Sequence, residues 1–107
     1  MVRIRFAALC GAFVLASLGG VFAAEHVVTM KGAAYAPETV TAAVGDTVRF
    51  VNDDDQNHGV FVPTAGYAFD LGKQEPGKET SYVLGKAGTL TVECAFHSHM
   101  MTTVEVK

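Results

Sequence analysis

The sequence has 107 residues, a formal charge of −3 at pH 7 and two cysteines. An acidic chain of this size argues against nucleic-acid binding and is compatible with a basic protein partner. Its length is enough for one modest domain, in which the core alone provides limited stability.

Residues 1–23 show the order of features that is typical of a secretory signal peptide. Arg3 and Arg5 form a short basic start, an uncharged apolar run follows as far as Phe22, and small residues come next. We therefore expect a helical signal peptide that directs the protein to the periplasm. An uncleaved membrane anchor is the alternative, because the apolar run is close to the roughly 18 residues that a membrane span needs.

Cleavage is expected after Ala23, with Ala24 as a second possible site. Removing residues 1–23 changes the formal charge from −3 to −5, because this segment carries two arginines and no acidic residue. Residues 24–107 are then expected to form one monomeric domain without contact to the membrane.

The rest of the chain consists of short β-rich runs separated by turn residues, which predicts an all-β sandwich or barrel. The expected strands are Glu25–Lys31, Glu38–Val44, Thr47–Asn52, His58–Val62, Thr80–Leu84, Thr89–Cys94 and Thr102–Val106. Residues 32–37 are expected to be a crossing segment with Tyr35 as its apolar anchor. Residues 63–72 are expected to form a loop packed by Tyr67 and Phe69, and residues 73–78 a turn.

Alternation along the strands predicts which side chains face the core. Leu90, Val92 and Cys94 share one parity, so a core-facing Leu90 and Val92 would place Cys94 in the core at the end of its strand. Val104 and Val106 are expected to face inward in the last strand. A core-facing thiol beside a tight loop suits a buried metal site.

Cys94 is the only cysteine left after Cys10 is removed with the signal peptide. A lone thiol in an exported protein is either buried and inert or a metal ligand. His97 and Met100 follow it at intervals of three residues, and His58 can complete the set. Two histidines, one cysteine and a weak axial methionine form the usual blue-copper arrangement. We therefore predict one type 1 copper ion.

These motifs resemble those of the cupredoxins, most closely the plastocyanin- and amicyanin-like members with a short ligand loop. The matching segments are Tyr35–Val40, Gly45–Asn52, His58 and the loop that begins at Cys94. The resemblance implies a Greek-key β-sandwich over residues 24–107. It also implies that His58, Cys94 and His97 are equatorial ligands, that Met100 is the axial ligand, and that the protein transfers single electrons in the periplasm.

The sequence departs from this family at three positions near the predicted site. Gly59 stands where relatives carry a polar residue, often asparagine, that ties the two ligand loops together. Phe96 and Ser98 stand where many relatives have proline. The ligand loop is therefore expected to be less rigid than theirs.

His99 and Met101 provide more donor atoms than one blue-copper site needs. We expect His99 to be exposed beside the site and Met101 to pack into the core. The alternative is that His99 replaces a ligand or holds a second ion. The acidic run Asp53–Asp55 is expected to be a solvated turn, or else a docking patch for a basic cytochrome or oxidase.

The predicted function is single-electron transfer between redox proteins, such as a cytochrome, an oxidase or a dehydrogenase. An apolar patch of Phe61, Ala65 and Phe96 around His97 is expected to receive these partners. The alternative function is that of a periplasmic copper carrier or buffer, which the extra donor residues favour. We do not expect an enzyme, because no general base or substrate pocket is indicated.

Overall fold

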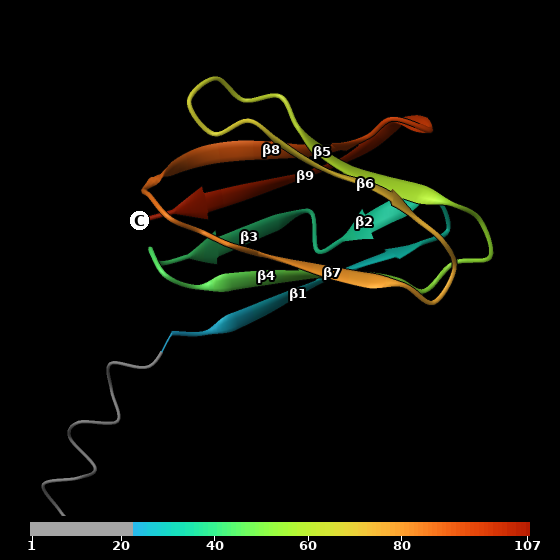
Figure 1. Cartoon of the computed structure of the whole chain (residues 1–107), viewed down its shortest axis with the longest axis horizontal. Coiled ribbons are helices and arrows are strands. Elements are labelled where there is room, and N and C mark those ends of the chain that lie inside the picture. The colour runs from blue at the N-terminus through green and yellow to red at the C-terminus, as the bar shows by residue number, and fades with distance from the viewer. Residues whose placement is uncertain (1–22) are drawn as a thin grey trace, which may run out of the picture.

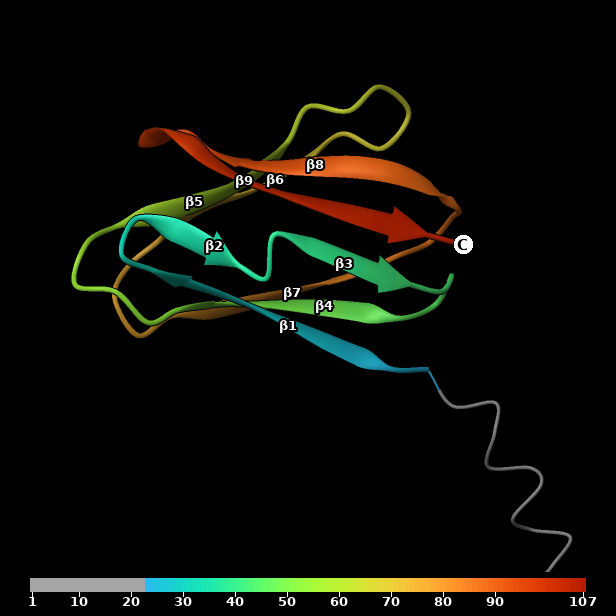
Figure 2. The ribbon, with the colours of Figure 1, turned by 180° about the vertical axis from the view of Figure 1, so that it is seen from behind.

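The computed structural model describes residues 23–107 as two β-sheets that pack face to face, and no helix occurs in this range (Figures 1 and 2). The first sheet, in the order β2-β1-β4-β7, contains β2 (Ala34–Ala36), β1 (Glu25–Lys31), β4 (Thr47–Asn52) and β7 (Glu79–Val83). The second, in the order β3-β9-β8-β5-β6, contains β3 (Thr39–Ala42), β9 (His97–Val106), β8 (Gly88–Cys94), β5 (His58–Val62) and β6 (Phe69–Gln74). The predicted all-β sandwich is confirmed.

The predicted signal peptide helix lies outside the described residues. Within residues 23–107, no helix is long and apolar enough to cross a membrane. The start of β1 and the C-terminus lie at the same end of the sandwich, where Lys107 N–H donates to the Ala42 carbonyl (Figure 1).

The chain passes between the sheets several times, in the β2–β3, β3–β4, β4–β5, β6–β7 and β7–β8 connections. Such crossing connections are typical of Greek-key sandwiches rather than of simple meanders. They place strands that are distant in the sequence side by side, so that β5 lies between β8 and β6. This placement brings His58, at the start of β5, to the same end of the sandwich as the end of β8.

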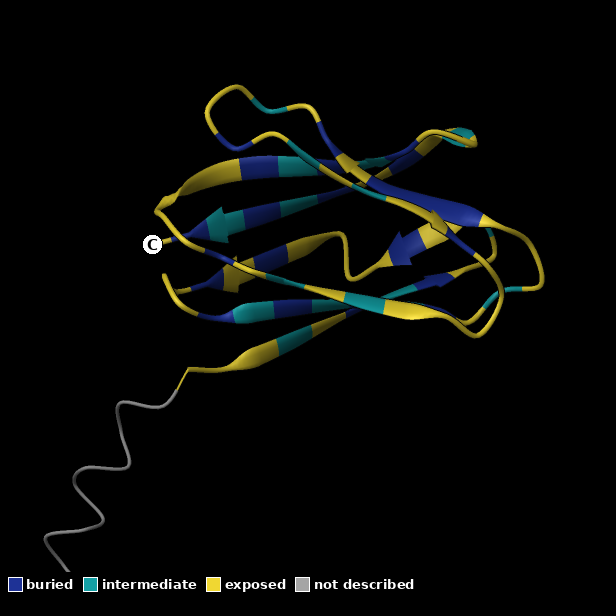
Figure 3. Ribbon diagram, viewed as in Figure 1, coloured by how far each residue is buried: buried dark blue, intermediate teal, exposed yellow. Residues whose placement is uncertain are grey.

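Buried residues, dark blue in Figure 3, occur in both sheets. Their apolar side chains form one core. Its largest fully buried apolar members are Phe50, Met30, Leu84, Leu90 and Met100. Each large side chain of this kind stabilises the fold by roughly 1.5–3 kcal/mol relative to an exposed position. The predicted inward parity of the last two strands is confirmed, because Leu90, Val92, Cys94, Val104 and Val106 are all buried.

Strand β6 corrects the prediction of a loop followed by a turn over residues 63–78. Phe69 and Leu71 are partly buried against the core and Gln74 is buried, although the alternation is interrupted by a glycine. Gly72 has φ 78°, and the pairing with β5 shifts there, so that Leu71 has no partner in β5. A β-bulge with glycine in the left-handed region therefore explains why the strand pattern was missed.

Strand β9 begins at His97 and not at Thr102, which corrects a second boundary. Its pairing with β8 shifts between Glu93, which faces Met101, and Cys94, which faces His97. Met100 shares the parity of Thr102, Val104 and Val106, and like them it is buried. The expectation that Met101 packs into the core is wrong, because its side chain is 52% exposed on the opposite face.

Candidate metal centre

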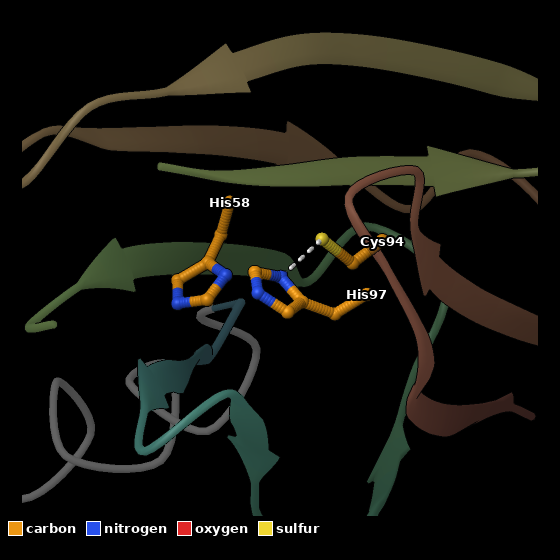
Figure 4. Close-up of side chains that lie close together, drawn as sticks. All are labelled: His58, Cys94 and His97. Carbon is orange, nitrogen blue, oxygen red and sulfur yellow. Dashed lines mark hydrogen bonds between the residues drawn. The ribbon is translucent and has the colours of Figure 1, made fainter. Parts of the chain in front are cut away.

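Three side chains from two regions of the sequence meet at one end of the sandwich (Figure 4). His58 opens β5, Cys94 ends β8, and His97 follows across the turn into β9. One donor atom from each lies within 4.8 Å of the donors of the other two. The centroids of the two imidazole rings are 4.9 Å apart, and the ring planes are tilted by 58°. The structure thus brings together three of the four predicted ligands.

The spacing of these donors fits a metal ion. His97 Nδ1 lies 3.9 Å from Cys94 Sγ. Bonds of about 2.0 Å to imidazole and about 2.3 Å to thiolate, at a trigonal angle, place the two donors about 3.7 Å apart. Cys94 is a free, buried thiol. The pair therefore needs little movement to share one ion.

His58 carries the most informative single atom of the cluster. The side chain is fully buried, and its Nδ1 has no hydrogen-bond partner among the residues that the structure describes. Its Nε2–H donates to Asp54 Oδ2 at 2.8 Å. Because a carboxylate accepts a proton donor there, the neutral ring carries its lone pair on Nδ1. A buried lone pair without a partner is costly, and a bound cation would satisfy it.

The backbone of Gly59 contacts both the Cys94 sulfur and the Tyr35 hydroxyl. Gly59 N–H donates to Cys94 Sγ at 3.3 Å, and the Gly59 carbonyl accepts from the buried Tyr35 hydroxyl. Burial, with smaller contributions from the charges of Cys94 and Glu93, raises the pKa of Tyr35 well above its usual value of about 10. The backbone of Gly59 thus links the Cys94 thiol at the end of β8 to the Tyr35 hydroxyl in β2.

His97 lies nearer the surface than His58. Its Nε2 contacts Gln56 Oε1 at 3.2 Å, and Gln56 belongs to the exposed connection between β4 and β5. The ring is only partly buried, whereas His58 is fully enclosed. One predicted ligand is therefore held in the interior and the other close to solvent.

Met100 is buried in the bulged start of β9, three residues after His97. Its role as the axial ligand stays a prediction. His99 is exposed beside the site, as expected, with its ring centroid 6.2 Å from that of His97 and its Nε2 3.1 Å from the Ala33 carbonyl oxygen.

The acidic turn before β5 contains a residue whose role the sequence did not reveal. The Asp53 side chain is 65% exposed, but that of Asp54 is only 10% exposed and turns toward His58. The Ala33 N–H and, after it, the His58 ring hold the pKa of Asp54 well below its usual value of about 4. The available signal was a carboxylate four residues before the first histidine ligand.

Comparisons with known proteins agree with this geometry. Neither protein-family models nor curated proteins match the sequence, but solved structures do. A purple cupredoxin from Nitrosopumilus maritimus aligns with a TM-score of 0.70 and 20% identity over 77% of this chain and 99% of that one. A reduced amicyanin variant aligns with a TM-score of 0.72 and 26% identity, over 78% and 82%. This chain has the cupredoxin fold.

A third structure with this cupredoxin fold is the copper-containing nitrite reductase from Thermus scotoductus SA-01. It aligns with a TM-score of 0.72 and 24% identity over 78% of this chain. This chain spans only 22% of the length of that reductase. The likeness therefore concerns one domain of a larger enzyme.

The donor set of this cupredoxin fold fits a single type 1 copper ion. Two imidazoles and a thiolate are the ligands that such sites use, with a weak axial contact in addition. The orphaned Nδ1 of His58 and the proximity of His97 Nδ1 to the Cys94 thiol are the observations that carry this fit.

Proposed function

We propose that this protein is a periplasmic electron carrier that binds one copper ion through His58, Cys94, His97 and Met100. The main support for this proposal is the buried, unpartnered Nδ1 of His58, which lies in a cluster with a free thiol and a second imidazole. When bound, copper supplies a one-electron couple between Cu(I) and Cu(II). The proposal assigns no substrate chemistry to this domain.

The protein's own residues favour donor positions that stay fixed during electron transfer. His58 is enclosed in β5, and Cys94 pairs with His97 at the end of the β8–β9 ladder. Strand pairing on both sides limits how far these donors can move, and preorganised ligands reduce rearrangement. The hydrogen bond from Gly59 N–H to the Cys94 sulfur is of the kind that tunes the potential of such sites.

We propose that a redox protein, such as a cytochrome, an oxidase or a dehydrogenase, docks beside His97. Phe61 and Phe96 are both exposed, and they line one hollow of about 350 Å³ next to the ligand turn. Asp70 and Lys73 provide polar groups at the same hollow. Ala65, the third member of the expected patch, does not line it. An apolar surface with a polar rim suits a transient protein partner.

The visible spectrum after addition of Cu(II) tests the proposed function. We expect an intense thiolate-to-copper band in the red, together with its loss in the Cys94→Ser variant. The control is Ser98→Ala, which changes an exposed hydroxyl near the site without removing a predicted ligand. Weak absorption typical of ordinary Cu(II), equal in the wild type and Cys94→Ser, would contradict the proposal.

A copper carrier or buffer is the second candidate function. The exposed His99 ring beside His97, together with the exposed Met101 on the same strand, favours it. Under this function, the double variant His99→Ala/Met101→Ala would slow the transfer of Cu(I) to a competing chelator. An electron carrier would show the same transfer rate in both proteins, because the ion stays in the buried site.

We further propose that export removes residues 1–23 and that the new N-terminus is tied to the domain. Ala24 N donates to Asp46 Oδ1 at 2.9 Å, and His26 Nε2 lies 2.9 Å from Asp46 Oδ2. An α-ammonium at Ala24 would turn the first contact into a charged one, which supports cleavage after Ala23. The intact mass of the exported protein tests this, and a chain that begins at Glu25 or Met1 would contradict it.

A further inference from the structure

The connection between β4 and β5, residues 53–57, contacts both predicted histidine ligands. We propose that Asp54 and Gln56 are positioning residues for the metal centre, Asp54 by fixing the His58 ring and Gln56 by fixing the His97 ring. This inference rests on the proposed copper function and adds two residues that touch the ligands but not the ion. One surface loop would then set the orientation of both imidazoles.

Asp54 is held in place from several directions. Its Oδ2 accepts from His58 Nε2–H at 2.8 Å and from Ala33 N–H at 3.0 Å, and its Oδ1 accepts from Asp55 N–H at 2.9 Å. Ala33, which donates one of these hydrogen bonds, adopts φ 56°, a conformation that non-glycine residues rarely take. A residue in a rare backbone conformation and a half-buried carboxylate are therefore both in place beside one predicted ligand.

The contact from Asp54 decides which nitrogen of His58 is available to bind a metal ion. An ionised carboxylate only accepts hydrogen bonds, so Nε2 carries the proton and Nδ1 keeps its lone pair. That Nδ1 is buried and has no hydrogen-bond partner among the described residues. Metal-binding histidines commonly donate their other N–H to a carboxylate, which fixes the ring and raises its basicity. His58 and Asp54 have this relationship before any ion is bound.

Gln56 plays the corresponding part at the outer ligand. Its Oε1 lies 3.2 Å from His97 Nε2, while His97 Nδ1 faces the Cys94 sulfur. An amide oxygen that accepts from Nε2–H leaves the lone pair on Nδ1, as Asp54 does for His58. The contact is longer and more exposed than that of Asp54, so its effect should be smaller.

Asn52 fixes the shape of the loop from inside the fold. It is fully buried at the end of β4, and its side-chain amide donates to the carbonyls of Gln56 and Gln74 at 2.9 and 2.8 Å. Its Oδ1 accepts from Asp54 N–H at 3.0 Å. The backbone of both positioning residues is thus anchored to one buried side chain. The backbone positions of Asp54 and Gln56 are therefore fixed relative to each other, although the loop is on the surface.

Copper affinity tests the role of Asp54, measured by competition with a chromophoric Cu(II) chelator. Loss of such an outer contact lowers metal affinity by about 10- to 100-fold, and we expect this for Asp54→Ala. Asp54→Asn keeps an acceptor oxygen and should recover part of the loss. Asp55→Asn is the matched control, because it removes the same charge from the next residue, whose side chain is exposed. It should bind copper as the wild type does.

The reduction potential provides a second readout. A negatively charged partner on the outer N–H of His58 stabilises the more highly charged Cu(II) form, so Asp54→Asn should raise the potential. The rise should exceed that of Asp55→Asn, which reports the effect of charge alone. Gln56→Ala should reduce affinity by less than Asp54→Ala, because its contact is longer and partly solvated.

The tautomer of His58 in the metal-free protein can be read directly by nitrogen NMR. Among rings that carry a single proton, we expect this proton on Nε2 in the wild type, and the measurement needs no variant if Asp54→Ala fails to fold. A proton on Nδ1 would overturn the proposal. So would equal copper affinity and equal potential in Asp54→Asn and Asp55→Asn, with an intact blue band. The absence of a blue band in the wild type would instead contradict the proposed function.

Discussion

Two histidine–aspartate pairs lie at opposite ends of this sandwich, and they differ in what surrounds them. His58 and Asp54 meet at 2.8 Å beside Cys94, and His26 and Asp46 meet at 2.9 Å beside the start of β1. His58 is fully buried, whereas the His26 side chain is 25% exposed. Among residues 23–107, the one group that could hold a metal includes His58 and excludes His26.

The difference shows that the contact between an imidazole and a carboxylate does not itself make a metal site. At the His58 end, the second ring nitrogen is buried in a cluster with a thiol and another imidazole. At the other end, Asp46 also accepts from the backbone N–H groups of Ala24 and Ala43. The first carboxylate contacts a predicted ligand, and the second joins the beginning of the domain to the β3–β4 turn.

Replacing each histidine by glutamine should give the largest difference in effect between the two ends of the sandwich. His58→Gln removes an equatorial ligand, so we expect loss of the intense red band, while His26→Gln should leave the band unchanged. Free copper at a thousandfold excess over its dissociation constant stabilises a protein by about 4 kcal/mol. Thermal unfolding with and without copper should show this gain in the wild type and His26→Gln, but not in His58→Gln. A retained band in His58→Gln would exclude His58 as a ligand.

Acid should weaken the Asp46 end in a defined range of pH. Hydrogen bonds from Ala43 N–H, then from His26 and Ala24, lower the pKa of Asp46 to about 2 from its usual value of about 4. A lowered folded-state pKa stabilises the fold above pH 4, and this stabilisation is lost as the pH falls toward 2. Denaturant unfolding of the metal-free protein should therefore show a steeper loss in this range for the wild type than for Asp46→Asn.

The control for this pH prediction is Asp55→Asn, whose side chain is exposed. It should keep the acid dependence of the wild type, and at neutral pH it should be more stable than Asp46→Asn. If Asp46→Asn keeps the full acid dependence, the stabilising carboxylate lies elsewhere.

The smallest effects are expected from two glycine-to-alanine variants, one at each end. A methyl group on Gly59 would lie 3.6 Å from Phe96 and 3.7 Å from Ala95 N, which are ordinary contacts. Gly59→Ala should therefore change stability by less than about 0.5 kcal/mol and keep the red band. Gly45, beside Asp46, has open space but a φ of 96°, so Gly45→Ala should cost about 1 kcal/mol. Equal stability of the two variants would contradict this ranking.

Sequence reasoning performed best where a single physical rule applied. Alternation placed Cys94 in the core at the end of β8, because Leu90 and Val92 share its parity. For Met101 the rule was not applied, because the inward parity of Val104 and Val106 places Met101 on the outer face. Alternation failed for β6, where the bulge at Gly72 interrupts the period of two. A bulge depends on the neighbouring strand, which a local pattern does not contain.

The sequence by itself determined the β-rich character of the domain, the inward parity of its last strands and the donor types at positions 58, 94 and 97. These follow from residue chemistry and from periodicity over a few neighbouring residues. Only the tertiary structure decided that the acidic run is divided, with Asp53 in solvent and Asp54 against His58. Three adjacent aspartates are chemically identical, and their separation depends on Asn52, whose burial is decided by the fold, and on Ala33, which is 21 residues away in the sequence.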